Sequence, residues 1–142
     1  MATVYPIVNS HFLVEWGGSR VGFTEVTGLD YETPPIDYRE GNDTVYNVSK
    51  LPGMPKYPNI VLKRGKLEAD NEFHTWLATI QLNQVERRTL KISILNEEHN
   101  PIETWQVTAA FPCKYTGPQL KSSTSEVAVE SIEICHEGWV KL

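Results

Sequence analysis

Short runs in which apolar and polar residues alternate dominate this chain, and they constrain its fold more than any other feature. A period of two places successive side chains on opposite faces, which is typical of strands that are buried on one face. The clearest runs are 11–16, 31–40, 59–64, 90–94, 105–111 and 126–140. They predict about seven strands and a mainly β fold.

The connections between the runs predict antiparallel pairs. Gly17-Gly18 ends the first run and indicates a tight hairpin turn into a second strand at about 21–23. The polar stretch 96–101 predicts another hairpin, between the runs on either side of it.

Three runs carry irregularities. Pro34-Pro35 lies inside 31–40, so we expect that run to be an edge strand or a strongly bent one. In 105–111 we expect an apolar face made by Trp105, Val107, Ala109 and Phe111. In the last run the apolar positions slip in phase between Val129 and Ile132, which predicts a bulge or a bend.

One stretch has a helical period. Phe73, Trp76, Leu77 and Ile80 recur at i, i+3, i+4 and i+7, and Asp70 with Asn71 supplies candidate N-caps. We expect one α-helix over about residues 70–82. The predicted fold class is mainly β, with antiparallel strands in either a small barrel or two packed sheets and this one flanking helix, and a doubly wound parallel sheet is excluded.

Length and composition limit the function. The 142 residues are enough for a single domain, 1–142, and the content of 40% hydrophobic and 22% charged residues is that of a globular protein. A formal net charge of −5 argues against specific nucleic-acid binding. No apolar run reaches the roughly 20 residues of a membrane span, so we expect the chain to be made and folded in a cytoplasm, without direct membrane anchoring.

Motifs that would indicate catalysis are missing. The four histidines have no close metal-ligand spacing, so we predict no metal site, no cofactor and no enzymatic activity. Cys113 and Cys135 are expected to be buried or half-buried thiols and not a disulfide. A hidden Cys–His nucleophile pair is the distant enzymatic alternative.

The segment between the runs 31–40 and 59–64 is unusual for a small β domain. It contains Pro52, Pro55 and Pro58, and from Lys50 to Lys66 there are five basic residues and no acidic one. A connection of about 17 residues without clear periodicity is uncommon unless it is functional. Such charge segregation suits either a contact with the acidic part of a neighbouring copy or a solvated basic loop.

An ordered set of short motifs resembles the tail tube proteins of contractile-tailed phages. The resemblance is closest to the inner-tube proteins of phage-tail-like contractile injection systems and to the related hemolysin-coregulated tube protein of type VI secretion. The set comprises Phe23–Leu29 (FTEVTGL), Tyr38–Gly41 (YREG), Leu51–Gly53 (LPG), Leu62–Gly65 (LKRG), Asp70–Phe73 with Trp76, Glu86–Arg88, Leu95–His99 and His136–Gly138. Asn42 departs from it, because related sequences often carry a second small residue after Arg-Glu-Gly.

The resemblance implies a small antiparallel β-barrel of two packed sheets with one flanking α-helix. It also implies that such subunits assemble into hexameric rings, and that the rings stack into a hollow tube. Such a tube lies inside a contractile sheath, carries baseplate and tip or spike proteins at its end, and is driven through a target envelope on firing. Whether cargo travels in the lumen stays open, as does the kind of particle: a phage, a released injection device or a membrane-anchored system. In this family an extended arm between the third and fourth strands, here Gly41–Pro58, reaches a neighbouring subunit.

We expect the arm, the residues before it and one tryptophan near the C-terminus to form the ring and stack contacts. These residues are Tyr38, Arg39, Glu40, Gly41, Val45, Tyr46, Val48, Lys50, Leu51, Pro52, Gly53, Met54, Lys56, Tyr57 and Trp139. The apolar side chains among them would be exposed in a lone monomer. The alternative function is a monomeric β-barrel binding module whose basic loop holds an acidic ligand.

Overall fold

The structure is a computed structural model that describes residues 5, 7–18, 22–42, 44, 47–68, 70–81 and 84–142. Within these residues it has nine strands and one helix. They are β1 (Phe12–Glu15), β2 (Glu25–Thr27), β3 (Pro35–Tyr38), β4 (Ser49–Pro52), β5 (Ile60–Gly65), α1 (Glu72–Leu77), β6 (Arg88–Leu95), β7 (Pro101–Thr116), β8 (Val129–Cys135) and β9 (Trp139–Lys141). The predicted mainly β class with one helix is confirmed.

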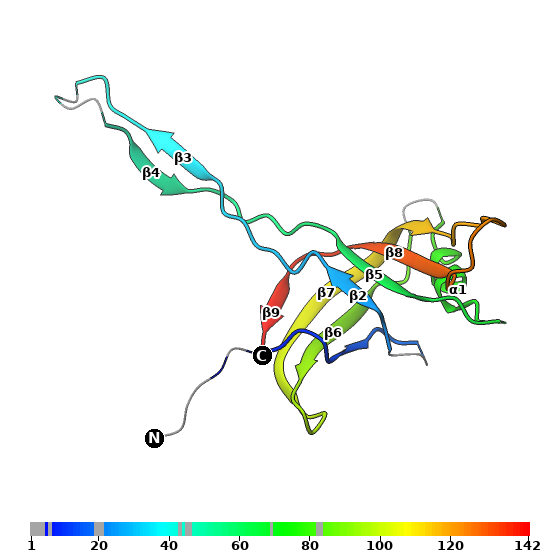
Figure 1. Cartoon of the computed structure of the whole chain (residues 1–142). Coiled ribbons are helices and arrows are strands. Elements are labelled where there is room, and N and C mark those ends of the chain that lie inside the picture. Colours follow the sequence, from blue (N-terminus) through cyan, green and yellow to red (C-terminus); the bar gives the residue numbers. More distant parts are fainter. Residues whose placement is uncertain are drawn as a thin grey trace.

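Seven of these strands form one antiparallel sheet, and two stand apart from it (Figure 1). The order in the large sheet is β1-β6-β7-β8-β5-β2, and β9 also pairs with β7. Strands β3 and β4 pair only with each other. The chain therefore consists of a body and a separate two-stranded ribbon.

Strand β7 bends the sheet over. Its first part pairs with β6 as far as Ala110, and its last part pairs with β8 from Phe111 onward. Ala109, at the change, has a φ of 53°, which is uncommon for a residue other than glycine. Because of this irregularity Val107 and Ala110 both point inward, so the expected face through Ala109 and Phe111 is wrong beyond Val107.

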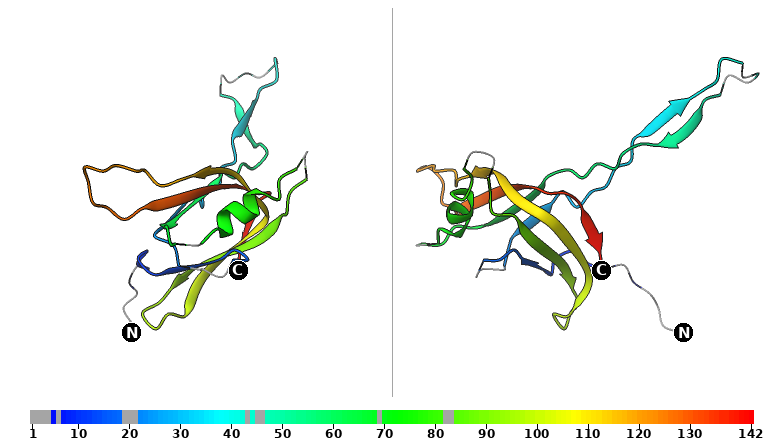
Figure 2. Two further views of the ribbon diagram at one scale, coloured as in Figure 1. Left: turned by 90° about the vertical axis from the view of Figure 1, so that its right-hand side faces the viewer. Right: turned by 180° about the vertical axis from the view of Figure 1, so that it is seen from behind.

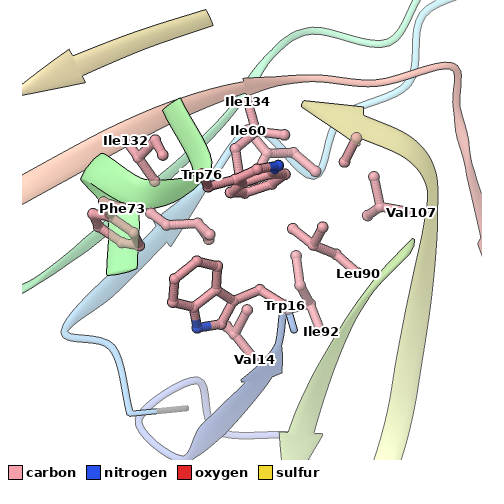
Figure 3. Packing of buried hydrophobic residues seen from close by; sticks show 12 residues of the cluster. Val14, Trp16, Ile60, Phe73, Trp76, Leu90, Ile92, Val107, Ile132 and Ile134 are labelled. Atoms are coloured by element: carbon pink, nitrogen blue, oxygen red, sulfur yellow. The ribbon is translucent and has the colours of Figure 1, made fainter. Parts of the chain in front are cut away.

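The core lies between the two halves of the bent sheet and beneath the helix (Figure 3). Trp16 is at its centre, with ring centroids 5.0 Å from Phe73 and 5.9 Å from Trp76. The Trp76 indole Nε1 donates to the Glu86 carbonyl at 2.8 Å, which satisfies its buried polar atom. The buried apolar residues are Val14, Trp16, Ile60, Leu62, Phe73, Trp76, Leu90, Ile92, Val107, Ala110, Ile132 and Ile134.

Helix α1 is shorter than the helical period predicted, ending at Leu77 and not near residue 82. Phe73 and Trp76 are buried as expected, but Ile80 lies beyond the helix and is 43% exposed. The Asp70 carboxylate accepts a hydrogen bond from the Glu72 backbone N–H at 3.3 Å, in the first turn. The Asp70 side chain thus satisfies a backbone N–H at the helix N-terminus, while the Asn71 side chain makes no capping hydrogen bond.

The expected hairpin through Gly17-Gly18 is wrong. Strand β1 pairs with β6, with Phe12 opposite Ile94, and β2 pairs with β5, with Val26 opposite Leu62. Val21, at the start of the expected second strand, lies outside the described residues. The hairpin of β6 and β7, in contrast, is confirmed.

The bulge or bend expected in the last run, from the phase slip between Val129 and Ile132, is also wrong. The register of β8 with β5 is continuous from Val129 to Ile134. The inward positions are Glu130, Ile132 and Ile134, while Val129 is 39% exposed. A buried glutamate therefore occupies a core position that the apolar pattern alone assigns to its neighbour.

The ribbon of β3 and β4 projects away from the body, on the side opposite helix α1 and the β7–β8 loop (Figures 1 and 2). It includes the run 31–40, where the expected edge strand is confirmed as β3, so the arm comprises residues 31–58 and not 41–58 alone. Strand β4 lies in the segment where no regular structure was expected. In the described part of the chain no helix is long and apolar enough to cross a membrane.

Candidate functional site

The arm is the candidate functional site, and antiparallel pairing builds it. Ile36 faces Leu51 and Asp37 faces Lys50 in the register of β3 with β4. Backbone bonds continue the pairing toward the body, since the Gly53 N–H donates to the Pro34 carbonyl at 2.9 Å. Nearer the body the bridge between Glu32 and Lys56 adds two more bonds, of 3.0 and 2.6 Å. The arm thus consists of two legs joined by a hairpin.

Proline suits such a ribbon. Both strands of a two-stranded sheet are edges, so a missing N–H can face solvent. The fixed φ of proline also limits the conformations of the unfolded segment, which lowers the entropy lost when the arm is ordered. Five prolines lie in the arm: Pro34, Pro35, Pro52, Pro55 and Pro58.

The ribbon has one apolar face and one polar face. Alternate side chains of a strand point to opposite faces, so Ile36, Tyr38 and Leu51 share one of them. Their side chains are 54%, 50% and 48% exposed. On the other face Lys50 Nζ lies 2.6 Å from Asp37 Oδ1, an exposed ion pair that contributes less than about 1 kcal/mol. Burial against another surface would therefore stabilise the arm mainly through its apolar face.

The other residues expected at subunit contacts lie along the same arm. The Tyr38 hydroxyl donates to Glu40 Oε1 at 2.9 Å. Val48 is 40% exposed and Met54 83%. The remaining exposed ones are Arg39, Gly41, Pro52 and Lys56. Val45 and Tyr46 lie outside the described residues.

The five basic residues between Lys50 and Lys66 do not gather on the arm. Lys63 pairs with Glu25 at 3.3 Å, and Arg64 and Lys66 both approach Glu130. Residues 31–58 hold three basic and four acidic side chains, a net charge of −1. The interpretation of residues 50–66 as one basic segment is therefore wrong, because three of its five cations belong to β5 and the residue after it.

Aromatic rings gather where the arm leaves the body. The Tyr57 ring lies 5.4 Å from Tyr31, 5.7 Å from Trp139 and 6.0 Å from His136, measured between centroids. The Trp139 indole Nε1 donates to the Asp30 carbonyl at 3.1 Å. Trp139, which we expected at a subunit contact, thus lies half-buried against both legs of its own arm.

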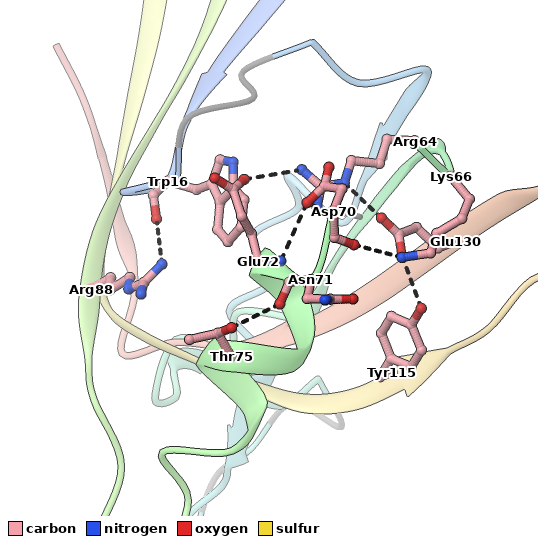
Figure 4. Close-up of polar contacts among 10 residues, drawn as sticks. All are labelled: Trp16, Arg64, Lys66, Asp70, Asn71, Glu72, Thr75, Arg88, Tyr115 and Glu130. Atoms are coloured by element: carbon pink, nitrogen blue, oxygen red, sulfur yellow. Dashed lines mark hydrogen bonds and ion pairs between the residues drawn. The ribbon is translucent and has the colours of Figure 1, made fainter. Parts of the chain in front are cut away.

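A buried ionic network connects helix α1 to the sheet (Figure 4). Arg64 Nε donates to Glu130 Oε1 at 2.9 Å, and Nη2 lies 3.3 Å from Asp70 Oδ1. The guanidinium carbon is 3.8 Å from the Phe73 ring centroid. Partial burial raises the pKa of Tyr115, and the hydrogen bond that Tyr115 donates to Glu130 adds to that rise.

Sequence reasoning missed this network, although the strands carried a signal for it. Arg64 has the same alternation phase as Ile60 and Leu62, and Glu130 has the phase of Ile132 and Ile134. Opposite charges at core positions of two strands indicate a buried pair, because an isolated buried charge is costly.

The two cysteines lie on adjacent strands. Cys113 is the extra residue at the register shift between Pro112 and Lys114, and its thiol donates to the Glu133 carbonyl at 3.3 Å. Both thiols are free. Cys135 is half-buried as expected, whereas Cys113 is exposed, so the expected burial is wrong for Cys113. Partial burial of its sulfur, with a hydrogen bond to Cys135 as the next cause, raises the pKa of Cys113 to about 12 although the residue as a whole is exposed. A nucleophile needs a lowered pKa, so this environment opposes a catalytic role.

Comparison with known proteins identifies the fold and the family. The family model described as T4-like virus tail tube protein gp19 matches residues 8–140. No curated protein matches the chain.

Solved structures agree with the family match. A chain of the PVC sheath-tube complex, an extracellular contractile injection system in its extended state, is 33% identical over 97% of this chain and 92% of its own, with a TM-score of 0.88. A chain of the anti-feeding prophage cap, which terminates the tube, is 35% identical over 100% and 94%, with a TM-score of 0.91. Hcp1 from Flavobacterium johnsoniae shares the fold, at 13% identity over 92% and 94% and a TM-score of 0.56. The chain therefore belongs to the T4-like tail tube protein family and is a structural protomer of a tube.

Proposed function

We propose that this tube protomer assembles through its arm into hexameric rings, and that the rings stack into the hollow inner tube of a contractile injection system. A sheath protein surrounds this tube, and baseplate and tip or spike proteins complete its end. Sheath contraction then drives the tube through a target envelope. The relatives in a sheath-tube complex and in a tube-terminating cap support this assignment.

The observation that carries the proposal is the exposed apolar face of the arm. A two-stranded ribbon alone is marginally stable in water, and β3 and β4 are exposed along their whole length. The apolar side chains of Ile36, Tyr38 and Leu51 stabilise the arm only when another surface buries them. A neighbouring copy of the chain supplies that surface in a ring or a stack.

The geometry of the arm also favours an open polymer. The arm projects from one end of the body, so the surface that receives it is a different part of the next copy. Such a heterologous contact closes into a ring about one axis or continues as a filament along another. A tube made of stacked rings uses both.

The monomeric binding module loses its basis in this structure. That hypothesis required a basic loop for an acidic ligand, but the loop 41–58 has a net charge of only +1 and the whole arm 31–58 has −1. Lys50 is paired with Asp37, and Arg64 is buried against Glu130. The arm thus offers an apolar surface and no concentrated positive charge.

Sedimentation velocity and negative-stain electron microscopy of the purified full chain test the proposal. We expect ring-sized species at low concentration, and hollow rings or stacked tubes in the micrographs as the concentration rises. A monomer that persists at high concentration, with no rings, would contradict it.

A further inference from the structure

The turn between β8 and β9 holds both legs of the arm. His136 Nε2 lies 3.0 Å from the carbonyl oxygen of Pro58, where the second leg ends. The Trp139 indole Nε1 donates to the carbonyl of Asp30, immediately before the first leg, at 3.1 Å. One four-residue segment of the body therefore contributes one side-chain contact to each leg.

The hydrogen bonds fix the tautomer of His136. The Gly138 backbone N–H donates to Nδ1 at 3.1 Å, so Nδ1 must present its lone pair. In the neutral ring the proton is then on Nε2, which donates to the Pro58 carbonyl. The imidazole thus links the backbone of the turn to the backbone of the arm.

Gly138 allows this turn to approach the arm. Its φ is 125°, in the region that favours glycine, and a Cβ there would lie 3.3 Å from Tyr57 Cε2. The Tyr57 ring is consequently held between the turn and Tyr31, whose ring lies 6.4 Å from that of Trp139. Hydrogen bonds and ring contacts act together on both legs.

We propose that His136 and Trp139 are positioning residues that set the direction in which the arm leaves the body. Since β3 and β4 are exposed throughout, the contacts that orient the arm lie at its base. A ribbon held by one leg can swing about that leg, whereas one held by both cannot. The direction then determines where the arm meets a second copy of this chain, a consequence that rests on the proposed function.

The ribbon is long, so a small rotation at its base displaces its far end by several ångströms. From Tyr31 to Tyr38 an extended strand covers about 23 Å, so a rotation of about 10° at the base moves the far end of β3 by about 4 Å. Such a displacement is close to the spacing between paired strands, about 4.8 Å. Loss of the base contacts would therefore misplace the apolar face of the arm by nearly the width of one strand.

Pulsed electron spin resonance measures the direction of the arm. Nitroxide labels are attached at Asn47→Cys on the arm and Lys91→Cys on β6, in a full-length chain that also carries Cys113→Ser and Cys135→Ser. Both labelled positions are exposed. Dilution into unlabelled chain restricts the measurement to distances within one subunit, whether or not the protein assembles.

Conservative variants separate positioning from folding. His136→Gln keeps a donor for the Pro58 carbonyl, His136→Ala removes both hydrogen bonds, and Trp139→Phe keeps a ring but loses the N–H. His99→Ala, in the β6–β7 turn, is the matched control. We expect His136→Ala with Trp139→Phe to broaden the distance distribution, whereas His136→Gln alone and His99→Ala keep the distribution of the parent chain.

An unchanged distribution in the folded His136→Ala, Trp139→Phe chain would overturn the positioning role, and so would an equal broadening in His99→Ala. In electron micrographs we expect the double variant to give fewer and less regular stacks. The single variant His136→Gln should give stacks like those of the parent chain. Normal stacks from a chain with a broadened distribution would overturn the link to assembly. Failure of the unsubstituted chain to form rings would instead contradict the proposed function, because the distance measurement does not require assembly.

Discussion

Arg64 on β5 and Glu130 on β8 face each other in register, and both side chains are buried, with Arg64 Nε donating to Glu130 Oε1 at 2.9 Å. The same guanidinium reaches Asp70, which precedes helix α1. A six-residue helix has little stability of its own, so its position depends on such contacts and on the burial of Phe73 and Trp76. This network therefore fixes the helix end of the body.

Removing one member of that pair should destabilise the body strongly. Glu130→Ala leaves the buried Arg64 cation with only part of its compensation, and we expect the free energy of unfolding to fall by about 3–5 kcal/mol. Urea denaturation followed by circular dichroism measures the change.

An exposed ion pair that also involves β5, between Lys63 on β5 and Glu25 on β2, is the matched control. Lys63 and Glu25 lie 3.3 Å apart with both side chains well exposed, so Glu25→Ala should cost less than about 1 kcal/mol. Equal losses for the two variants would contradict a special role for the buried pair.

Substitution of Gly28 should also be costly. Its φ is 95°, and a Cβ would lie 2.2 Å from the carbonyl oxygen of Asn59, where the two legs of the arm rejoin the body. Backbone strain and this clash together predict that Gly28→Ala loses at least about 2 kcal/mol in urea denaturation. Gly22→Ala, whose Cβ meets nothing within 4 Å, should leave stability within about 0.5 kcal/mol of the parent chain. Two equally stable variants would show that the approach of these backbones is not tight.

The raised pKa of Cys113 predicts slow alkylation. The thiolate is the reactive form, and a pKa of about 12 leaves little of it at pH 8. Mass spectrometry should show iodoacetamide reacting with Cys113 at least about tenfold more slowly than with free cysteine at that pH.

The pH dependence of the alkylation rate shows in which direction the pKa of Cys113 is shifted. Because the pKa is raised, the rate should still increase above pH 10, whereas an ordinary thiol levels off near pH 9–10. Cys135→Ala removes the contribution of the Cys135 side chain, but partial burial is the largest cause of the shift, so the pKa of Cys113 should stay raised. A plateau near pH 9 in the parent chain would contradict the assignment.

Much of the fold could be predicted from local pattern. Alternation located the strands around Val14, Leu62, Ile92 and Ile132, because strands buried on one face impose a period of two. The helix was found from Phe73 and Trp76, although it ends earlier than the pattern indicates. Strand pairing was less accessible: β1 pairs with β6, about 80 residues later in the chain, and no local signal specifies such a partner.

The arm shows a second limit of local reasoning. Its prolines and exposed apolar residues marked it in the sequence, but its hairpin depends on a register between Ile36 and Leu51 that the intervening residues do not reveal. The basic residues between Lys50 and Lys66 suggested one basic segment, but they are divided between the arm and the body. Lys50 pairs with Asp37 on the arm, whereas Arg64 pairs with Glu130 in the body. Charge counted along a chain says little about charge on a surface once strands separate the residues.

The two faces of the arm can be compared directly at two adjacent cross-strand pairs of the ribbon. Ile36→Thr with Leu51→Thr removes apolar surface while keeping residues that favour strands, and Asp37→Asn with Lys50→Gln removes only the ion pair on the opposite face. Negative-stain electron microscopy of both chains at equal concentration gives the number of stacked rings. We expect the threonine variant to lose stacks at least about tenfold, since two apolar contacts per subunit are lost, and the charge-neutral variant to stack as the parent chain does. Unimpaired stacking by the threonine variant would contradict the claim that the apolar face of the arm drives assembly.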